Sequence, residues 1–299
     1  MSEVGAPRPH APGQGAALDH SAARRTPRRR EVFLGDGGPG ETPFFAKKGV
    51  SPGGLMPTLY LDCTTGVSGD MLLASLSDAG RLCSYLEEQM AKLPLPGFRL
   101  EFAEARVAGI VTRRARVLQT ASQPLRHLED LTRIVEDAPY SEWVRKEALA
   151  VLRLLGEAEA RVHGLPLEKV HFHEIGAVDT VVDVTGTLLL VEKLGVKRVA
   201  ASAVNLGSGF VEIAHGRLPV PAPACAELAK GMRAFSTDIG METATPTGLS
   251  LVKRLAKTYG PLPEGVVRAV GYGSGTRSTD ERPTFVRAFL IDEDEGDAA

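Results

Sequence analysis

The sequence predicts an α/β or α+β protein with a mixed sheet, packed helices and a disordered N-terminal extension. Short apolar runs typical of strands alternate along the chain with longer segments of helical spacing. Hydrophobic residues make up 43% of the 299 residues, which is enough for a sizeable core. The first 56 residues differ, because their 10 Gly and 7 Pro and weak periodicity cannot offset the entropy of ordering the chain.

The composition therefore divides the chain into three expected parts. Residues 1–56 form a disordered extension rich in Pro, Gly and Arg, and residues 57–293 form one folded domain. Residues 294–299 form a short acidic tail that water solvates.

In the first half of the domain, each expected element has a local signal. Residues 58–63 are a short apolar run typical of a buried strand, and 70–80 have helical spacing that ends at Gly80. Residues 98–120 hold two alternating runs around Gly109, which predicts a β-hairpin. Three further helices are expected at 81–93, 126–138 and 141–164, the last with Ser141 as its N-cap.

The second half repeats the alternation of strands and helices. A strand is expected at 169–174, followed by an apolar helix at 177–195 that stops at Gly195. Thr245 and Pro246 suit the N-cap and first position of another helix. The remaining expectations are a strand at 198–206, a Gly/Pro-rich loop leading into a helix at 207–231, a strand from 266 running into a Gly-rich loop, and a last strand at 284–292.

The bulk properties exclude several classes of protein. The net charge of -2 argues against nucleic acid as the main partner. No apolar run reaches the roughly 18 residues of a membrane span. Cys63, Cys83 and Cys225 are widely spaced, so they offer neither a disulfide framework nor a Cys-x-x-Cys metal site. A reducing cytoplasm is the expected location.

The stretch HFHEIGAVDTVVDVTG, 171–186, concentrates metal-binding chemistry. On a strand, His171 and His173 would share one face, and on a helix Asp179 and Asp183 would lie one turn apart on one side. Mixed nitrogen and oxygen ligands suit Ni, Zn, Mn or Fe better than Ca. The alternative is a pair of hydrogen-bonded core histidines with aspartates that cap the helix.

Other residues are weaker candidates for the same chemistry. His215 lies in a proline-stiffened loop, where it is either a further metal ligand or a turn residue. Asp62 and Asp70 are further candidate cation ligands, although Asp70 is also well placed to interact with a positive helix end. His127 and His163 give weaker signals. No Ser/His/Asp set stands out, so catalytic residues stay unassigned.

Four small, Gly-rich loops look suited to phosphate. The first, TTGVSGDM, runs from a strand into a helix N-terminus, where free N–H groups favour anions. None matches a Walker A loop or a full dinucleotide fingerprint, and each taken singly is typical of a tight turn. Together they predict a phosphorylated ligand. Their candidate residues are Gly66, Ser68, Gly69, Gly207, Ser208, Gly209, Thr245, Thr247, Gly248, Gly273, Gly275 and Arg277.

Five of these segments occur in one order that resembles the LarC family of nickel insertion proteins, over about residues 57–291. They are YLDCTTGVSGDMLLASLSDAG, KVHFHEIGAVDTVVDVTG, LGSGFVEIAHGRLPVPAPA, TPTG and GYGSGTR. The resemblance implies a lyase-class enzyme that inserts Ni²⁺ into pyridinium-3,5-bisthiocarboxylic acid mononucleotide and forms Ni–S and Ni–C bonds. It also implies dependence on CTP with Mg²⁺ or Mn²⁺. The metal ligands expected from residue chemistry on these segments, rather than from known family ligands, are His171, His173, Asp179 and Asp183, with His215 as a further candidate. The loops are expected to hold the mononucleotide.

One departure from the family pattern, the absence of a further C-terminal domain, leaves alternatives open. Family members usually carry a further C-terminal domain that resembles the CTP-binding part, and that domain can be encoded in a shifted reading frame. The chain is then expected to be the N-terminal half of the enzyme, with a separate chain as partner. The alternatives are a non-catalytic nickel-binding subunit that needs such a partner, and a metal-dependent hydrolase of a phosphorylated small molecule. A homo-oligomer is also left open.

Overall fold

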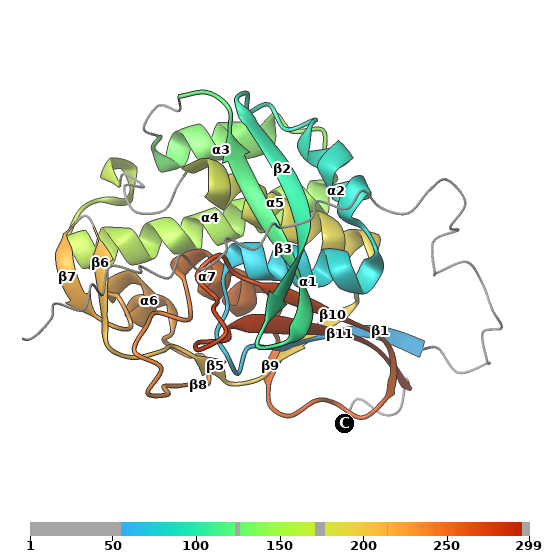
Figure 1. Cartoon of the computed structure of the whole chain (residues 1–299). Helices are drawn as coiled ribbons and strands as arrows, with labels where there is room; N and C mark the ends of the chain where they lie inside the picture. The colour runs from blue at the N-terminus through green and yellow to red at the C-terminus, as the bar shows by residue number, and fades with distance from the viewer. Residues whose placement is uncertain (1–54, 123–125, 171–176, 214, 295–299) are drawn as a thin grey trace, which may run out of the picture. The chain divides into compact units, whose positions relative to one another are not determined.

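The computed structural model describes residues 55–294 except 123–125, 171–176 and 214, all within the compact unit Glu31–Ala299 (Figure 1). Most of residues 1–56 and most of the acidic tail lie outside the described residues, so the expected disorder of the extension stays a prediction. The exceptions are the first residues of β1 and Asp294. The helices in the described part are α1 (Gly69–Gly80), α2 (Cys83–Met90), α3 (Leu128–Glu136), α4 (Glu142–His163), the 3-10 turn η1 (Leu167–Lys169), α5 (Ala177–Lys193), α6 (Pro223–Leu228) and α7 (Pro246–Leu255).

The main sheet of the described residues is mixed, as predicted. Its strand order is β2-β3-β10-β11-β1-β4-β9, in which β1 runs antiparallel to β11 and parallel to β4. Its strands are β1 (Leu55–Asp62), β2 (Phe98–Val107), β3 (Ile110–Gln119), β4 (Arg198–Ala201), β9 (Thr258–Tyr259), β10 (Val266–Ser274) and β11 (Phe285–Asp294). Two small ribbons pair β5 (Val204–Asn205) with β8 (Ala234–Phe235), and β6 (Phe210–Ile213) with β7 (Gly216–Pro219).

Helix α1 lies directly on the sheet because β10 presents glycines to it. α1 packs on β3, β10 and β11, while α5 packs on α1 and α4 packs on α5 (Figure 1). A Cβ added at Gly271 would lie 2.0 Å from the carbonyl oxygen of Ser75, and one at Gly273 would lie 2.1 Å from that of Met71. Only glycine allows the two backbones to approach this closely, so β10 fixes the height of α1 above the sheet.

Helix α5 is the centre of the core and explains its uniformly apolar sequence. Side chains on all its sides are buried, from Val178 through Val184 to Val191, because α1, α2, α3, α4 and α7 surround it. A helix that is hydrophobic all round is expected in such a position. Its polar residues near the N-terminal end, Asp179 and Asp183, are therefore the exception that needs an explanation.

Three expectations for the second half were wrong in detail. The strand at 198–206 is split into β4 and β5, because the chain leaves the main sheet after Ala201 and pairs with β8 instead. The loop at 207–231 contains the β6–β7 hairpin, whose side chains are mostly exposed and so give little hydrophobic signal. Lys169 ends a 3-10 turn rather than beginning a strand, and 171–174 lie outside the described residues.

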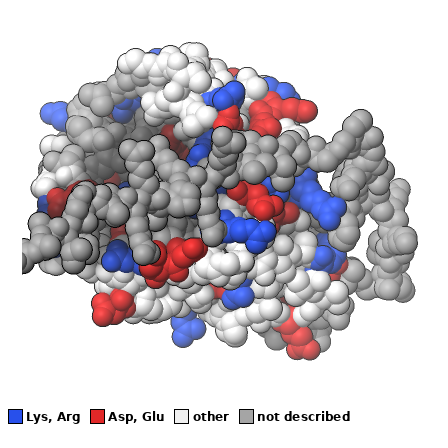
Figure 2. All heavy atoms as spheres, in the orientation of Figure 1, with Lys and Arg blue, Asp and Glu red and all other residues white. Residues whose placement is uncertain are grey.

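Two surface properties bear on partners. None of the helices in the described ranges is both long enough and apolar enough to cross a bilayer. On the face drawn in Figure 2, positive and negative side chains of the described residues are interspersed rather than gathered by sign. The described charges on this face therefore form no broad patch of one sign.

Candidate functional site

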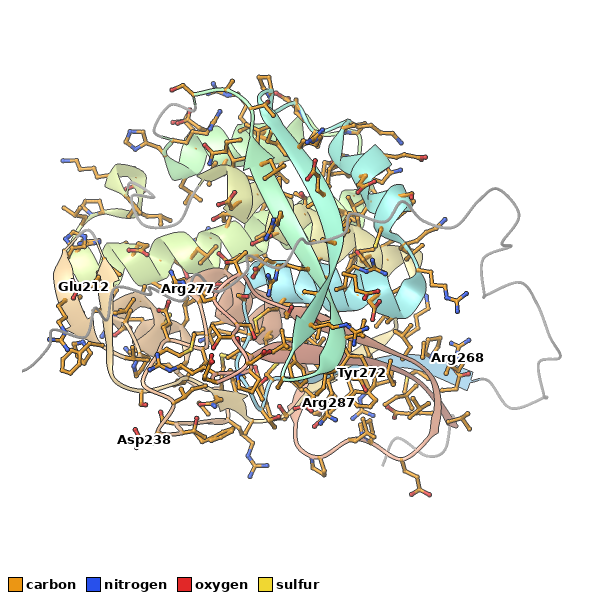
Figure 3. The ribbon with its side chains drawn as sticks, viewed as in Figure 1. Glu212, Asp238, Arg268, Tyr272, Arg277 and Arg287 are labelled. Carbon is orange, nitrogen blue, oxygen red and sulfur yellow. The ribbon has the colours of Figure 1, made fainter. Side chains whose placement is uncertain are left out.

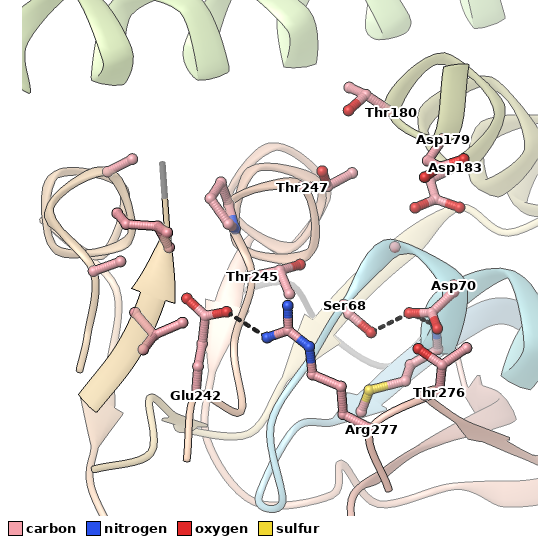
Figure 4. Close-up of a pocket in the computed structure, with 18 of the residues that line it drawn as sticks. Ser68, Asp70, Asp179, Thr180, Asp183, Glu242, Thr245, Thr247, Thr276 and Arg277 are labelled. Carbon is pink, nitrogen blue, oxygen red and sulfur yellow. Dashed lines mark hydrogen bonds and ion pairs between the residues drawn. The ribbon is translucent and has the colours of Figure 1, made fainter. Parts of the chain in front are cut away.

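A pocket of about 700 Å³ opens where the N-terminal ends of α1 and α7 meet the start of α5 (Figure 4). The C-terminal end of α4, part of β3 and the β6–β7 hairpin complete its wall. Its volume lies in the range of small-molecule sites. The polar and charged residues that line it are Ser68, Asp70, Arg116, Glu159, His163, Asp179, Thr180, Asp183, His215, Glu242, Thr243, Thr245, Thr247, Thr276, Arg277 and Thr284.

Asp70 occupies the first turn of α1 and faces the pocket. Its Oδ1 accepts hydrogen bonds from the Ser68 hydroxyl and from the N–H of Met71, at 3.0 Å for the latter, and the Thr276 N–H also donates to its carboxyl group. Burial raises the pKa of Asp70, and these hydrogen bonds offset part of that shift. The side chain is thus held rigidly at a positive helix end.

Asp183 approaches Asp70 from α5, and Gly69 makes room for it. A Cβ at position 69 would lie 2.2 Å from Oδ2 of Asp183. Asp183 is 8% exposed, and among the described residues its Oδ1 has no hydrogen-bond partner. Burial, and then the charges of Asp70 and Asp179, raise the pKa of Asp183 well above its usual range. A buried, unsatisfied carboxylate oxygen is costly, and either a proton or a bound cation would relieve that cost.

Asp179 lies one turn before Asp183 and completes a carboxyl cluster with Asp70 (Figure 4). Asp179 is the most exposed of the three, and partial burial of its carboxyl group, followed by the charge of Asp70, raises its pKa. Such groups repel one another when ionised, and a divalent cation bound beside them would offset that repulsion. We call Asp70, Asp179 and Asp183 the carboxyl cluster below.

The raised pKa values predict how the metal-free chain responds to pH. A carboxyl whose folded pKa is raised contributes stability below its unfolded pKa of about 3.9, and loses it as pH rises through the folded value. With a chelator present, Asp183→Asn should therefore gain in free energy of unfolding relative to the wild type as pH rises from 4 to 8, because only the wild type must ionise a buried group. Urea unfolding of both chains measures the difference. A difference independent of pH would show that Asp183 ionises normally in the folded chain.

Another wall of the pocket carries imidazoles. The rings of His163, at the end of α4, and His215, at the tip of the β6–β7 hairpin, lie 4.8 Å apart between centroids. Glu159 lies one turn before His163, with 3.4 Å between its Oε2 and the histidine Nε2. His171 and His173 lie outside the described residues. Across the ranges that the structure describes, no three His, Cys, Asp or Glu side chains converge closely enough to hold a metal as they stand.

The loop residues predicted to bind phosphate separate into two groups. Those that line the pocket are Ser68, Gly69, Thr245, Thr247, Gly275 and Arg277, and those outside its lining are Gly66, Gly207, Ser208, Gly209, Gly248 and Gly273. Most glycines of the second group meet backbone: a Cβ at Gly66 would lie 2.1 Å from the oxygen of Thr243, and one at Gly248 2.5 Å from that of Val67. Close packing alone therefore accounts for glycine at these two positions.

Groups suited to an anion remain on the lining. Helices α1 and α7 point their N-terminal ends into the pocket, where backbone N–H groups and the helix dipole favour negative charge. Thr245 caps α7 by accepting the N–H of Gly248 at 3.3 Å. Arg277 donates to Glu242 at 3.1 Å, which holds its largely exposed guanidinium at the rim (Figure 4).

Sequence reasoning missed part of the wall. Glu159, Glu242 and Arg116 are single charged residues within otherwise ordinary helix, loop and strand segments, and no local motif marks them. Asp62, in contrast, is a predicted candidate cation ligand that does not line the pocket and instead forms an ion pair with Arg287 at 2.8 Å.

Comparison with known proteins identifies the family of the chain without testing the residues of the pocket. The sequence profile described as nickel insertion protein matches residues 59–299. The chain belongs to the nickel insertion protein family. The predicted resemblance to the LarC family is thereby confirmed.

Relatives within the nickel insertion family are similar over most of this chain. A relative from Geobacter sp. (strain M21) is 41% identical over 243 residues, which are 81% of this chain and 63% of the relative. The pyridinium-3,5-bisthiocarboxylic acid mononucleotide nickel insertion protein of Staphylococcus epidermidis (strain ATCC 35984) is 36% identical over 238 residues, 80% of this chain and 60% of that protein. The chain thus spans about three fifths of the length of these relatives. No solved structure matches it.

Proposed function

We propose that this chain supplies the pocket in which nickel is inserted into pyridinium-3,5-bisthiocarboxylic acid mononucleotide. One observation carries the proposal: in a member of the nickel insertion family, Asp183 lines a ligand-sized pocket, and its buried Oδ1 has no hydrogen-bond partner among the described residues. The relative from Staphylococcus epidermidis is named for this substrate.

Nickel is a substrate in this proposal, and the carboxyl cluster receives it. Asp70 and Asp183 approach each other from α1 and α5, and Asp179 adds a third carboxyl group nearer the solvent. Oxygen ligands bind Ni²⁺ less tightly than an all-thiolate site does, so sulfur atoms of a substrate can displace them. His171 and His173 remain proposed ligands from the segment just before α5.

The mononucleotide is proposed to bind with its phosphate toward the helix ends. The N-termini of α1 and α7 and the guanidinium of Arg277 supply partial or full positive charge on the lining. Met71, Val162 and Leu218 supply apolar surface for the ring. The two thiocarboxylates would then lie within the same cavity as the nickel.

The chemistry requires the pocket to release nickel and to accept a proton. Two Ni–S bonds replace bonds from nickel to the protein, and the Ni–C bond replaces a ring C–H bond, so one proton must leave. Carboxylates that lose their nickel are bases already present in the cavity, and Asp179, as the most exposed of the three, can pass the proton on to water.

The other proposals concern the setting of the reaction. The CTP with Mg²⁺ or Mn²⁺ implied by the family is assigned to no residue of this pocket, and a partner chain or homo-oligomer remains a proposal. A cytoplasmic location fits the three cysteines, all of which are free and buried.

A reconstituted reaction tests the function. The purified chain is incubated with Ni²⁺, CTP, Mg²⁺ and the mononucleotide, and the nickel-containing product is followed by mass spectrometry. We expect product either from the chain alone or after a C-terminal segment of a family member is added. Product only after that addition would identify the chain as a subunit that needs a partner. Hydrolysis of simple phosphoesters without nickel transfer would overturn the proposal in favour of a metal-dependent hydrolase.

A further inference from the structure

On the wall of the pocket that carries imidazoles, Glu159 and His163 form a pair along one side of α4. His163 follows Glu159 by one turn of α4, so both side chains lie on the same side of the helix. Glu159 is 8% exposed, and ionisable side chains are rarely so buried without a paired group. The Glu159–His163 contact at 3.4 Å supplies such a pair on the pocket lining.

The β6–β7 hairpin brings a second imidazole to this pair. Residue Ile213 pairs with Gly216, so the connection between the strands is two residues long and fixes where His215 can reach. At the other end of the hairpin, Val220 donates its N–H to the oxygen of Gly209 at 2.9 Å. The hairpin stands beside the C-terminal end of α4, with Glu212 on its strand β6 (Figures 1 and 3).

The two rings lie close enough together on the pocket lining to share one ion. Their centroids are 4.8 Å apart and their planes are tilted by 48°, and both residues line the pocket. A carboxylate behind one imidazole is the usual support of a metal-binding histidine, because it fixes the ring and its tautomer. Nitrogen ligands suit Ni²⁺ and similar borderline metals.

We propose that His163 and His215 form a nickel-loading site, in which two imidazole nitrogens hold the ion and Glu159 positions His163. The proposal rests on the proposed function and adds a site distinct from the carboxyl cluster. Only two protein ligands are involved, and water fills the remaining positions. Such a site releases its ion readily, and the same pocket contains the carboxyl cluster that would receive it.

Nickel alone, titrated into the full chain by calorimetry, tests this site. The double variant His163→Asn/His215→Asn is expected to lose one equivalent of bound Ni²⁺, or to bind it on the order of 100-fold more weakly. His127→Asn is the matched control, because it removes an exposed imidazole outside the pocket lining and keeps a side chain suited to an N-cap. Unchanged stoichiometry and affinity in the double variant would overturn the proposal.

Two further measurements separate ligation from folding. Glu159→Gln should weaken Ni²⁺ binding about 10-fold, because the uncharged amide supports His163 less well. His215→Asn alone changes only an exposed hairpin tip, so it must show the weakening with an unchanged circular dichroism spectrum. In ¹⁵N-histidine spectra, Ni²⁺ must broaden the His163 and His215 resonances first, and earlier broadening elsewhere would contradict the site.

The outcome is distinguishable from that of the insertion assay, since the titration contains no mononucleotide. Nickel held by His163 and His215 without any transfer to substrate would end the proposed function and leave this site standing. If the double variant transfers nickel to the substrate and binds it with unchanged affinity, the proposed function stands and this site is ruled out.

Discussion

Asp183→Asn is expected to lower nickel insertion by on the order of 100-fold or more, while the folded chain stays at least as stable at pH 8. The variant keeps the shape of the side chain but removes the negative charge that nickel requires. Stability is preserved because Asp183 is buried beside Asp70, so its charge costs free energy when no metal is present. Initial rates at saturating mononucleotide, together with urea unfolding, measure the two effects.

Asp238→Asn is the matched control for this substitution. Asp238 is an exposed carboxylate outside the pocket lining (Figure 3), so its loss should leave both rate and stability unchanged. If Asp183→Asn keeps a rate within a few-fold of the wild type while Ni²⁺ still binds, the carboxyl cluster is not the site from which nickel is transferred.

Gly273→Ala is expected to destabilise the chain by about 3 kcal/mol, as overpacking of a tight contact does. The added Cβ would lie 2.1 Å from the oxygen of Met71 and 2.4 Å from the nitrogen of Ser75, so helix α1 would have to move off β10. Backbone atoms cannot rotate away as the end of a flexible side chain can. Thermal and urea unfolding give the size of the change.

Gly275→Ala separates packing from ligand binding at almost the same place in the chain. A Cβ there would meet Met71 at 3.4 Å and Asp70 at 3.6 Å, which are ordinary contacts, so the cost should stay within about 1 kcal/mol. Because Gly275 lines the pocket, its variant should instead change the KM for the mononucleotide. Equal free energies of unfolding for Gly273→Ala and Gly275→Ala would show that α1 does not approach β10 closely.

Local signals predicted the helices well because each signal acts within a few residues. Ser141 caps α4 by accepting the N–H of Val144 at 3.1 Å, and Thr245 caps α7 as predicted. The hairpin around Gly109 was also confirmed as β2 and β3. The β6–β7 hairpin was missed because its alternation spans only four residues a strand and it buries too little surface to show as a hydrophobic pattern.

The candidate site was predicted only in part. The helical spacing of Asp179 and Asp183 predicted that they share a side of α5, and the structure places both on the pocket. The position of Asp70 against them depends on Gly69 and on how α1 crosses α5, which no local pattern specifies. The roles of His171 and His173 stay predictions.

The sequence alone determined the types of segment, their caps, the paired carboxyls of α5 and the order of motifs that identifies the family. Only the tertiary structure decided which of these features meet: Asp70 with Asp183, His163 with His215, and Gly273 with the backbone of α1 rather than with a ligand. The physical reason is the separation along the chain over which each kind of interaction acts. Helix and turn preferences are set by neighbours along the chain, whereas contacts between distant segments follow from how the whole core packs.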